Sequence, residues 1–468
     1  MESKHSTKPG QNRWGSLYVI ASVMGSAVAS GWISPEVAGG QWKAMVVYIT
    51  GLMTQTNITA TNLAQEIGEV SHDAISRMLA GASWSLTVGI CLAIRVIEQI
   101  GGEGWLIVDD VLIPKVFGRE IAFCGWDHDH THNRTVFGQR LVFVVWSNGW
   151  LTIPVAFAFW QQDPNRKPKP KKKGGKRGWP KGKKRGPRPT PTNSKRRQPR
   201  WRLPNGIHYR TKNELARILV WKVLRCQLRV DWILFDNWYL SDDNLKHFAR
   251  LGLKWVSKAK SNLMVTYGGQ DLSVEAVAAT VGLGNYHYYP KLGGRVRSFL
   301  VSRKGLALRL TVIKKGHGSK LTTHYLLSND LTLTNQHQIN WYRRRWSIET
   351  FFRDTKQLLG LGRCQSRLPN AIVTHVALVC VAYACLQLLK PRSLHHRPSI
   401  VGSHQLLASL QVVWFQHQPQ LVRVQSSAQI SLVDPSPFWD AVRTRLSALP
   451  LPESPDFSKV YVPSSKAA

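Results

Sequence analysis

The order of hydrophobic patterns along residues 101–257 constrains the fold of this chain more than any other feature. An apolar run at 105–108 has the length and composition of a buried strand. Two longer stretches, 139–147 and 151–160, are rich in β-branched and aromatic residues, and the Asn148-Gly149 pair between them is a strong hairpin signal. The first part of this region is therefore expected to form one strand followed by a hairpin.

The second part of the same region alternates helix and strand. Thr211 can cap a helix over 212–226, and a buried strand is expected at 232–235. A helix at 242–250 then leads to another strand at 253–257. Strand, hairpin, helix, strand, helix, strand is the order of an RNase H-like core, an α/β fold built on a mixed sheet.

The 468 residues are enough for two or three structural units. Short strand signals separated by glycine pairs follow the core strands and indicate a β-rich insertion, after which helical periodicity resumes. The expected units are a helical N-terminal region (1–100), the first part of the core (101–257), the β-rich insertion (258–335), the second part of the core (336–392) and a polar C-terminal tail (393–468) with one possible helix at 405–415.

Three helical segments allow more than one interpretation. Residues 61–79, with Gly68 at a turn and Ser71 as an N-cap, fit a helix-turn-helix DNA-binding domain or two helices of an ordinary bundle. The apolar run at 14–33 resembles an export signal, but its many small residues favour a packed helix. Residues 371–389 are almost apolar enough to span a membrane, and polar residues within them favour a buried core helix.

The formal net charge of +36 predicts a polyanionic partner, with nucleic acid as the first candidate and an anionic membrane as the second. Residues 166–200 contain seventeen Lys or Arg and no acid, and their proline and glycine content excludes the basic amphipathic helix that membrane binding requires. We expect this segment to be disordered and to bind DNA phosphates, and we expect no membrane association. Its candidate DNA-binding residues are Lys171, Lys172, Lys173, Arg177, Lys183, Lys184 and Arg185. No phosphate-binding GxxxxGK[ST] loop occurs in the chain, so no nucleotide cofactor is expected.

Three acidic residues fall where this core needs them. Asp109 is expected to end the first strand, Asp236 ends the strand after the first helix, and Glu349 lies in a late helix. Metal-dependent phosphodiester hydrolysis uses two cations about 3.5 to 4 Å apart, held by hard oxygen ligands. Three convergent carboxylates meet that need, so these residues are the candidate catalytic and metal-binding groups.

The pattern around Glu349 is more specific than the acids alone. At about 100° per residue, Tyr342, Arg345, Glu349 and Lys356 lie in one narrow stripe of a helix. An exposed face with an ion pair between Arg345 and Glu349 is the common alternative. Aromatic residues on the other faces, such as Phe351, indicate that this helix is largely buried.

The spacing of these four residues matches the YREK signature of a branch of bacterial insertion-sequence DDE transposases, which the chain resembles. Two further segments are similar to the first and second aspartate motifs of that family. They are Val108-Asp109-Asp110 with Pro114-Lys115, and Phe235-Asp236-Asn237-Trp238-Tyr239. The resemblance covers roughly residues 100–160 and 205–390, and it also implies the β-rich insertion between the second Asp and the Glu.

The resemblance implies a DNA transposase that works by cut-and-paste transposition. Such an enzyme binds the ends of an insertion sequence, nicks them by hydrolysis that depends on Mg²⁺ (with Mn²⁺ as a substitute) and joins the 3′-OH to target DNA. Its partners are double-stranded DNA and a second copy of the chain, as a homodimer that bridges two ends. Asp109, Asp236 and Glu349 would be the metal ligands. Tyr342, Arg345 and Lys356 would hold phosphates near the cleaved end.

Three points stay open. Val111 stands where the family usually has Thr or Ser, so Asp110 competes with Asp109 as the first ligand. Related enzymes stack a flipped base on an aromatic residue of the insertion, and the residues that could do so here are Tyr267, Tyr286, Tyr288 and Tyr289. The run 127–132 alternates Asp and His and is expected to be a polar turn or loop, with a structural zinc site as the alternative.

Two other functions share parts of this pattern. A structure-specific nuclease such as a junction resolvase would have the same core and clustered acids, and a catalytically inactive derivative would keep only DNA binding. The presence of all three acids argues against the inactive derivative. Six cysteines without a CxxC pair fit a reducing environment, and we expect a bacterial cytoplasmic protein associated with the nucleoid.

Overall fold

A computed structural model describes residues 35–163 and 208–388, together with 410–415, 418–424 and 430–432. Within the first two ranges it leaves out 55–56, 68–69, 82–88, 91–92, 95–96, 99–101, 117, 119, 130–131 and 317–319. The apolar run at 14–33 and the basic segment 166–200, with its candidate DNA-binding residues, lie outside the described residues.

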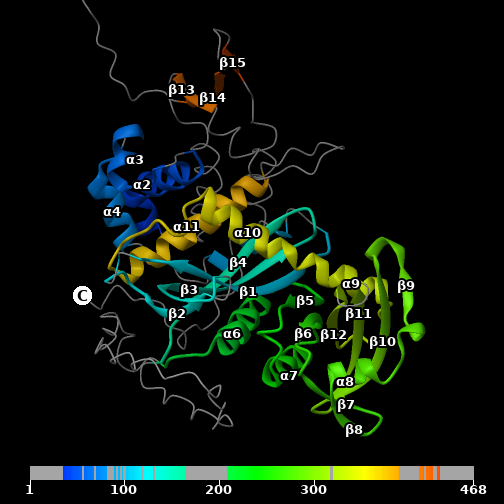
Figure 1. Cartoon of the computed structure of the whole chain (residues 1–468). Helices are drawn as coiled ribbons and strands as arrows, with labels where there is room; N and C mark the ends of the chain where they lie inside the picture. The colour runs from blue at the N-terminus through cyan, green and yellow to red at the C-terminus, as the bar shows by residue number, and fades with distance from the viewer. Residues whose placement is uncertain are drawn as a thin grey trace, which may run out of the picture.

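One large mixed sheet runs through the molecule (Figure 1). Its strand order is β2-β3-β1-β5-β6-β12-β11-β10-β7-β8, with β4 paired to β3 and β9 to β10. β1 is antiparallel to β3 and parallel to β5, and β5 is parallel to β6. The core strands are β1 (Trp105–Pro114), β2 (Gly125–Asp129), β3 (Arg134–Ser147), β4 (Thr152–Trp160), β5 (Trp232–Phe235) and β6 (Lys254–Ala259). These strands are the mixed sheet expected of an RNase H-like core.

Local sequence signals explain the core elements. The β3–β4 hairpin turns at Asn148, whose Oδ1 accepts the backbone N–H groups of Trp150 (3.0 Å) and Leu151 (2.8 Å), while Gly149 takes a φ of +87° that favours glycine. Helix α6 (Lys212–Arg225) begins with a capping box between Thr211 and Glu214.

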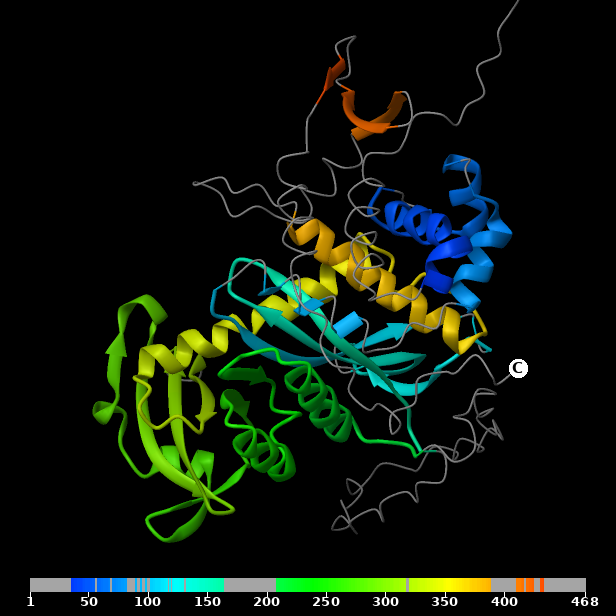
Figure 2. The same ribbon diagram turned by 180° about the vertical axis from the view of Figure 1, so that it is seen from behind.

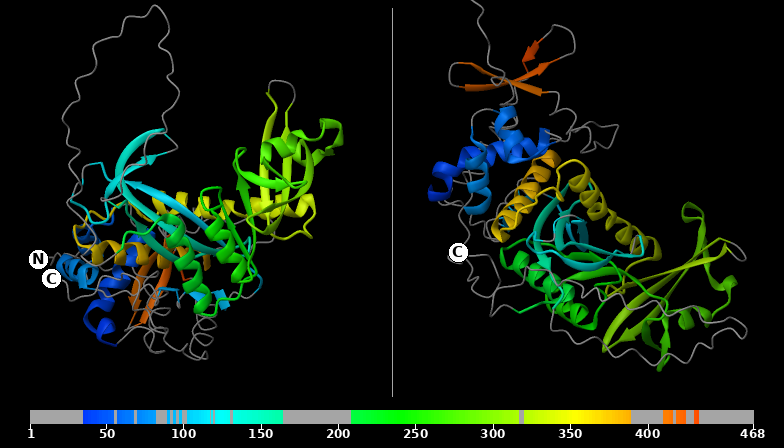
Figure 3. Two further views of the ribbon diagram at one scale, coloured as in Figure 1. Left: turned by 90° about the horizontal axis from the view of Figure 1, so that it is seen from below. Right: turned by 60° about the vertical axis from the view of Figure 1, so that its left-hand side comes forward.

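Alternate residues of β1 face two separate cores. Ile107 and Val111 pack with helices α10 (Trp346–Gln357) and α11 (Pro369–Leu388), whereas Leu106 and Val108 pack with α6 and α7 (Asp242–Arg250). Figure 3 shows the sheet between these two layers of helices. We refer to the side of α10 and α11 as the upper face and to the side of α6 and α7 as the lower face.

The β-rich insertion continues the core sheet instead of forming a separate one. Its strand β12 pairs with β6, with Leu327 opposite Ser257. The insertion extends to one side of the core (Figure 2). Its elements are β7 (Met264–Tyr267), β8 (Gln270–Ser273), α8 (Val274–Ala279), η1 (Leu283–Asn285), β9 (His287–Tyr289), η2 (Pro290–Leu292), β10 (Gly294–Arg303), β11 (Leu306–Lys315) and β12 (Thr322–Ser328). Helix α9 (Asn335–Arg344) then crosses the sheet and leads to α10.

Three N-terminal helices pack beside α11 (Figure 1). They are α2 (Pro35–Thr54), α3 (Ala60–Ile67) and α4 (His72–Gly81). Ser71 caps α4 as expected, its Oγ accepting from the Ala74 N–H at 3.2 Å. Whether α3 and α4 bind DNA as a helix-turn-helix stays a prediction.

One helix among the described residues, over Pro369–Gln387, has the length and apolar composition of a membrane span. Its polar side chains are buried against the rest of the protein. His375 Nδ1 lies 2.8 Å from the Tyr48 hydroxyl, and Gln387 Oε1 accepts from the Thr152 N–H at 3.3 Å. These contacts place the segment in the protein core, between α2, α4 and β4.

Three details differ from expectation. β1 does not end at Asp109, because its antiparallel ladder with β3 continues to the pair of Pro114 and Gly138. Residues 127–129 belong to strand β2 instead of a turn or loop, since they pair with β3. Residues 410–415 form strand β13 (Leu410–Phe415) and not a helix, in a small sheet with β14 (Gln418–Val424) and β15 (Ile430–Leu432). The β-branched and aromatic residues of 412–415 favour an extended chain there.

Candidate active site

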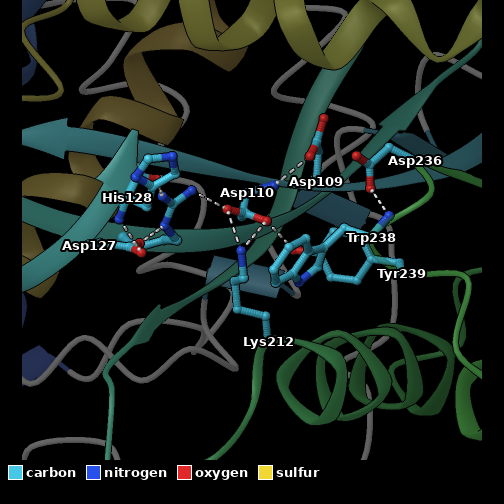
Figure 4. A network of polar contacts seen from close by, with 9 residues as sticks. Asp109, Asp110, Asp127, His128, Lys212, Asp236, Trp238 and Tyr239 are labelled. Atoms are coloured by element: carbon cyan, nitrogen blue, oxygen red, sulfur yellow. Dashed lines mark hydrogen bonds and ion pairs between the residues drawn. The ribbon is translucent and has the colours of Figure 1, made fainter. Parts of the chain in front are cut away.

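Asp109 and Asp110 project to opposite faces of the sheet because side chains alternate along β1. Asp109 follows Ile107 on the upper face, and Asp110 follows Val108 on the lower face. Figure 4 shows the two carboxylates pointing in different directions from adjacent positions. Only Asp109 therefore faces the helix that carries Glu349.

Asp236 comes next to Asp109 through the register of the parallel strands. The β1–β5 ladder ends at the pair of Val108 and Phe235, so the two aspartates follow at the same level. The backbones of neighbouring strands are about 4.8 Å apart. A tight turn fixes Asp236: its Oδ1 accepts the Trp238 N–H at 2.8 Å, and its carbonyl accepts the Ser257 hydroxyl at 3.1 Å. Both acids lie on the upper face.

Burial and mutual repulsion make this pair of acids difficult to ionise. Burial, followed by the nearby charge of Asp236, raises the pKa of Asp109 to about 7. Burial also raises the pKa of Asp236 above its usual value, although the Trp238 N–H and Arg345 oppose that effect. Two such carboxylates held together favour a bound cation, because its charge offsets their mutual repulsion.

Arg345 connects Asp109 with Glu349. Its Nη1 donates to Asp109 Oδ2 at 2.8 Å, and its Nη2 donates to Glu349 Oε1. Although burial disfavours its charge, these carboxylates and Tyr342 hold the pKa of Arg345 above its usual value. The Tyr342 ring lies 5.7 Å from the Arg345 guanidinium. Tyr342, Arg345 and Glu349 thus gather over the two aspartates.

The expected continuous helix is interrupted at Arg345, which lies between α9 and α10. Its N–H bonds to the Tyr342 carbonyl at 3.1 Å, a tighter turn than that of an α-helix. Lys356 lies two turns beyond Glu349 on α10, and its electrostatic neighbours are Asp129 and Arg140. The contacts of Arg345 thus join three of the four residues of the predicted stripe to the aspartates, and Lys356 has other neighbours.

A divalent cation fits part of this arrangement. Asp109 and Asp236 offer the hard oxygen donors that Mg²⁺ or Mn²⁺ prefers. Among the residues that the structure describes, however, no three His, Cys, Asp or Glu side chains are placed to hold one metal ion. The Glu349 carboxylate is paired with Arg345, which also donates to Asp109.

Asp110 anchors a separate network on the lower face (Figure 4). It accepts from Arg140 Nη1 at 2.5 Å, from the Tyr239 hydroxyl at 2.9 Å and from Lys212 Nζ at 3.2 Å. Arg140 also donates through Nε to Asp127. These donors hydrogen-bond the Asp110 carboxylate and link β1 to α6 and to the turn after Asp236. The contacts of Asp110 are therefore those of a structural residue.

Sequence reasoning did not identify Arg140, Lys212 or Tyr239 as parts of this network. Tyr239 belongs to the segment that resembles the family's second aspartate motif, and Lys212 begins a capped helix. No local pattern links either residue to Asp110. Lys115, which belongs to the segment that resembles the first aspartate motif, is buried. Its Nζ donates to the carbonyls of Gly362 (2.5 Å) and Cys364 (2.6 Å), which fixes the loop after α10 to the end of β1.

The other candidate sites are less complete. In the run 127–132, Arg140 engages Asp127, and His132 Nδ1 lies 2.7 Å from Asp129 Oδ2. No metal cluster occurs there among the described residues. Of the tyrosines considered for base stacking, Tyr286 is buried and donates to the Ala278 carbonyl, whereas Tyr288 is 54% exposed. Tyr288 therefore remains available for stacking and Tyr286 does not.

Two family models match parts of the chain that contain these acids. The family model described as DDE superfamily endonuclease matches residues 40–291, more than half of the chain, and includes Asp109 and Asp236. The model of the archaeal ISC1217-like transposases matches residues 202–382, which include Asp236 and Glu349. No curated protein matches the chain.

Proposed function

This chain belongs to the DDE superfamily endonucleases, and we propose that it is an insertion-sequence transposase that cuts the ends of its own element and joins them to target DNA. One observation carries the proposal. Asp109 and Asp236 lie side by side on the face covered by α10, and Arg345 links Asp109 to Glu349. Membership of the YREK branch rests on the spacing of Tyr342, Arg345, Glu349 and Lys356.

In this proposal Asp109, Asp236 and Glu349 are the metal ligands, and Asp110 is not. The family's divalent cation, which we take to be Mg²⁺, would activate water and stabilise the leaving oxygen. The chain's own groups position the substrate. Arg345, once released from Glu349, would hold a phosphate oxygen through its fork of donors. The Tyr342 hydroxyl lies beside it, and homodimers would bring two element ends together.

The direct test is cleavage of linear duplex DNA that carries the native gene's flanking ends. With Mg²⁺ we expect nicks at the element boundary, ends bearing 3′-OH, and strand-transfer products when target plasmid is added. Duplexes with scrambled ends should stay intact. Cutting of four-way junctions without preference for the flanking ends would contradict the proposal and favour a resolvase.

We also propose that the basic segment 166–200 binds DNA phosphates, because its seventeen cationic residues are uncompensated by any acid. Replacing it with a neutral Gly-Ser linker of equal length keeps the connection between β4 and α6. DNA affinity should fall, and the slope of log affinity against log salt should become shallower by about 0.9 for each phosphate that the segment no longer neutralises. Titrations at several salt concentrations measure this, and an unchanged slope would show that the segment is only a tether.

A further inference from the structure

Three basic residues of neighbouring strands form a diagonal row that begins beside the acidic pair. They are Lys258 on β6, His324 on β12 and Lys315 on β11. β6 is next to β5, and β12 and β11 follow in that order. Phe235 pairs with Ser257, so Lys258 stands beside Asp236 at the same end of the sheet.

All three side chains project to the upper face. Val256 packs with the upper core, and Leu326 and Ile313 pack with Ile339 of α9. Lys258, His324 and Lys315 are each two residues from one of these, and residues two apart in a strand share a face. Leu234 places Asp236 on this face by the same rule.

The strand spacing gives the row its length. Lys258 is opposite Leu326, His324 is opposite Ile313 and Lys315 is opposite Thr322, so each step of the row moves one strand across and two residues along. With strands about 4.8 Å apart and residues about 3.3 Å apart along a strand, Lys258 lies roughly 8 Å from His324 and roughly 16 Å from Lys315. One phosphate group cannot span that distance. A nucleic-acid strand advances about 3.4 Å per nucleotide, so the row corresponds to about five nucleotides.

The positive charge of the row is not balanced within the described residues. No ion pair there involves Lys258, His324 or Lys315. Burial lowers the pKa of His324, and Lys258 and Lys315 lower it further, which shows that the three groups share one neighbourhood. An anion placed among them would relieve their mutual repulsion.

We infer that Lys258, His324 and Lys315 bind phosphates at successive points along the DNA strand whose scissile phosphate lies at Asp109 and Asp236. This inference rests on the proposed function, because it takes the acidic pair as the cleavage site. The β-rich insertion thereby extends the catalytic face and sets the direction of the bound DNA strand. The DNA strand runs from β1 across β5 and β6 towards β12 and β11.

The test compares the salt dependence of DNA binding among single variants. The ligand is the linear duplex with native flanking ends, in EDTA so that no cleavage occurs. Lys258→Gln and Lys315→Gln should each make the slope of log affinity against log salt shallower by about 0.9, and the double variant by about 1.8. Lys246→Gln is the matched control, because Lys246 is exposed on α7, on the lower face, and its replacement should leave the slope unchanged.

A second measurement identifies the phosphates themselves. Neutral methylphosphonate at single positions within about five nucleotides of the cleaved bond should weaken binding by the unaltered protein. At the position that Lys258 binds, Lys258→Gln should show no further decrease in affinity. Unchanged slopes in both lysine variants would overturn the inference that these residues bind DNA phosphates, and would leave the proposed function standing. Failure of the unaltered protein to bind the duplex overturns both.

Discussion

Glu349→Gln is expected to slow metal-dependent DNA cleavage by roughly 10³-fold, equivalent to about 4 kcal/mol of transition-state stabilisation. Gln keeps the shape of the side chain but removes the charge that a hard cation requires. The position is partly exposed, with 32% of the side chain accessible, so the neutral amide can be accommodated without unfolding. The measurement is the single-turnover rate of nicking at the native ends in saturating Mg²⁺.

The ion pair with Arg345 makes this variant informative in a second way. In the unaltered protein Glu349 and Asp109 share the guanidinium, and the variant leaves Asp109 as its only carboxylate partner. DNA affinity in EDTA should therefore change little while cleavage slows by roughly 10³-fold. Glu275→Gln is the control, since Glu275 is exposed in the first turn of α8 within the insertion. Equal cleavage by Glu349→Gln and the unaltered protein would contradict the assignment of Glu349.

Features set by local sequence were predictable. The hairpin follows from Asn148-Gly149, α6 from the Thr211 cap, and the position of Asp236 from the short apolar strand before it. The pairing of β1 with β5 also followed from the topology of the core, which brought Asp109 close to Asp236. The hairpin, the cap and the strand before Asp236 depend on residues a few positions apart, where turn, cap and periodicity rules act.

Beyond the pairing of β1 with β5, features set by long-range contacts were not predictable. Nothing near Asp109 shows that β1 continues to Pro114, because its partner strand supplies the ladder. Whether Asp109 or Asp110 faces α10 depends on strand register, which a one-residue slip would reverse. The interruption at Arg345 separates α9 from α10 where an uninterrupted stripe was expected. Contacts between residues far apart in the sequence decide each of these points.

Arg140→Met is expected to lower the free energy of unfolding by about 3 to 5 kcal/mol. The Arg140 side chain is 9% exposed and holds two carboxylates, Asp110 (8% exposed) and Asp127 (22% exposed). Methionine fills a similar volume but leaves both acids without their shared cation. Lys212 still neutralises part of Asp110, which places the expected decrease toward the lower end of that range. Urea denaturation followed by far-UV circular dichroism measures it.

The control is an exposed ion pair of the same type. Arg367→Met removes the partner of Glu120 at a site where the arginine is 76% exposed, and such surface pairs contribute at most about 1 kcal/mol. A double variant, Arg140→Met with Asp110→Asn, should be more stable than Arg140→Met alone, because it removes one of the stranded charges. If Arg140→Met is as stable as Arg367→Met, Asp110 does not depend on Arg140 for its burial. The lower-face network would then not be what fixes the strand that carries Asp109.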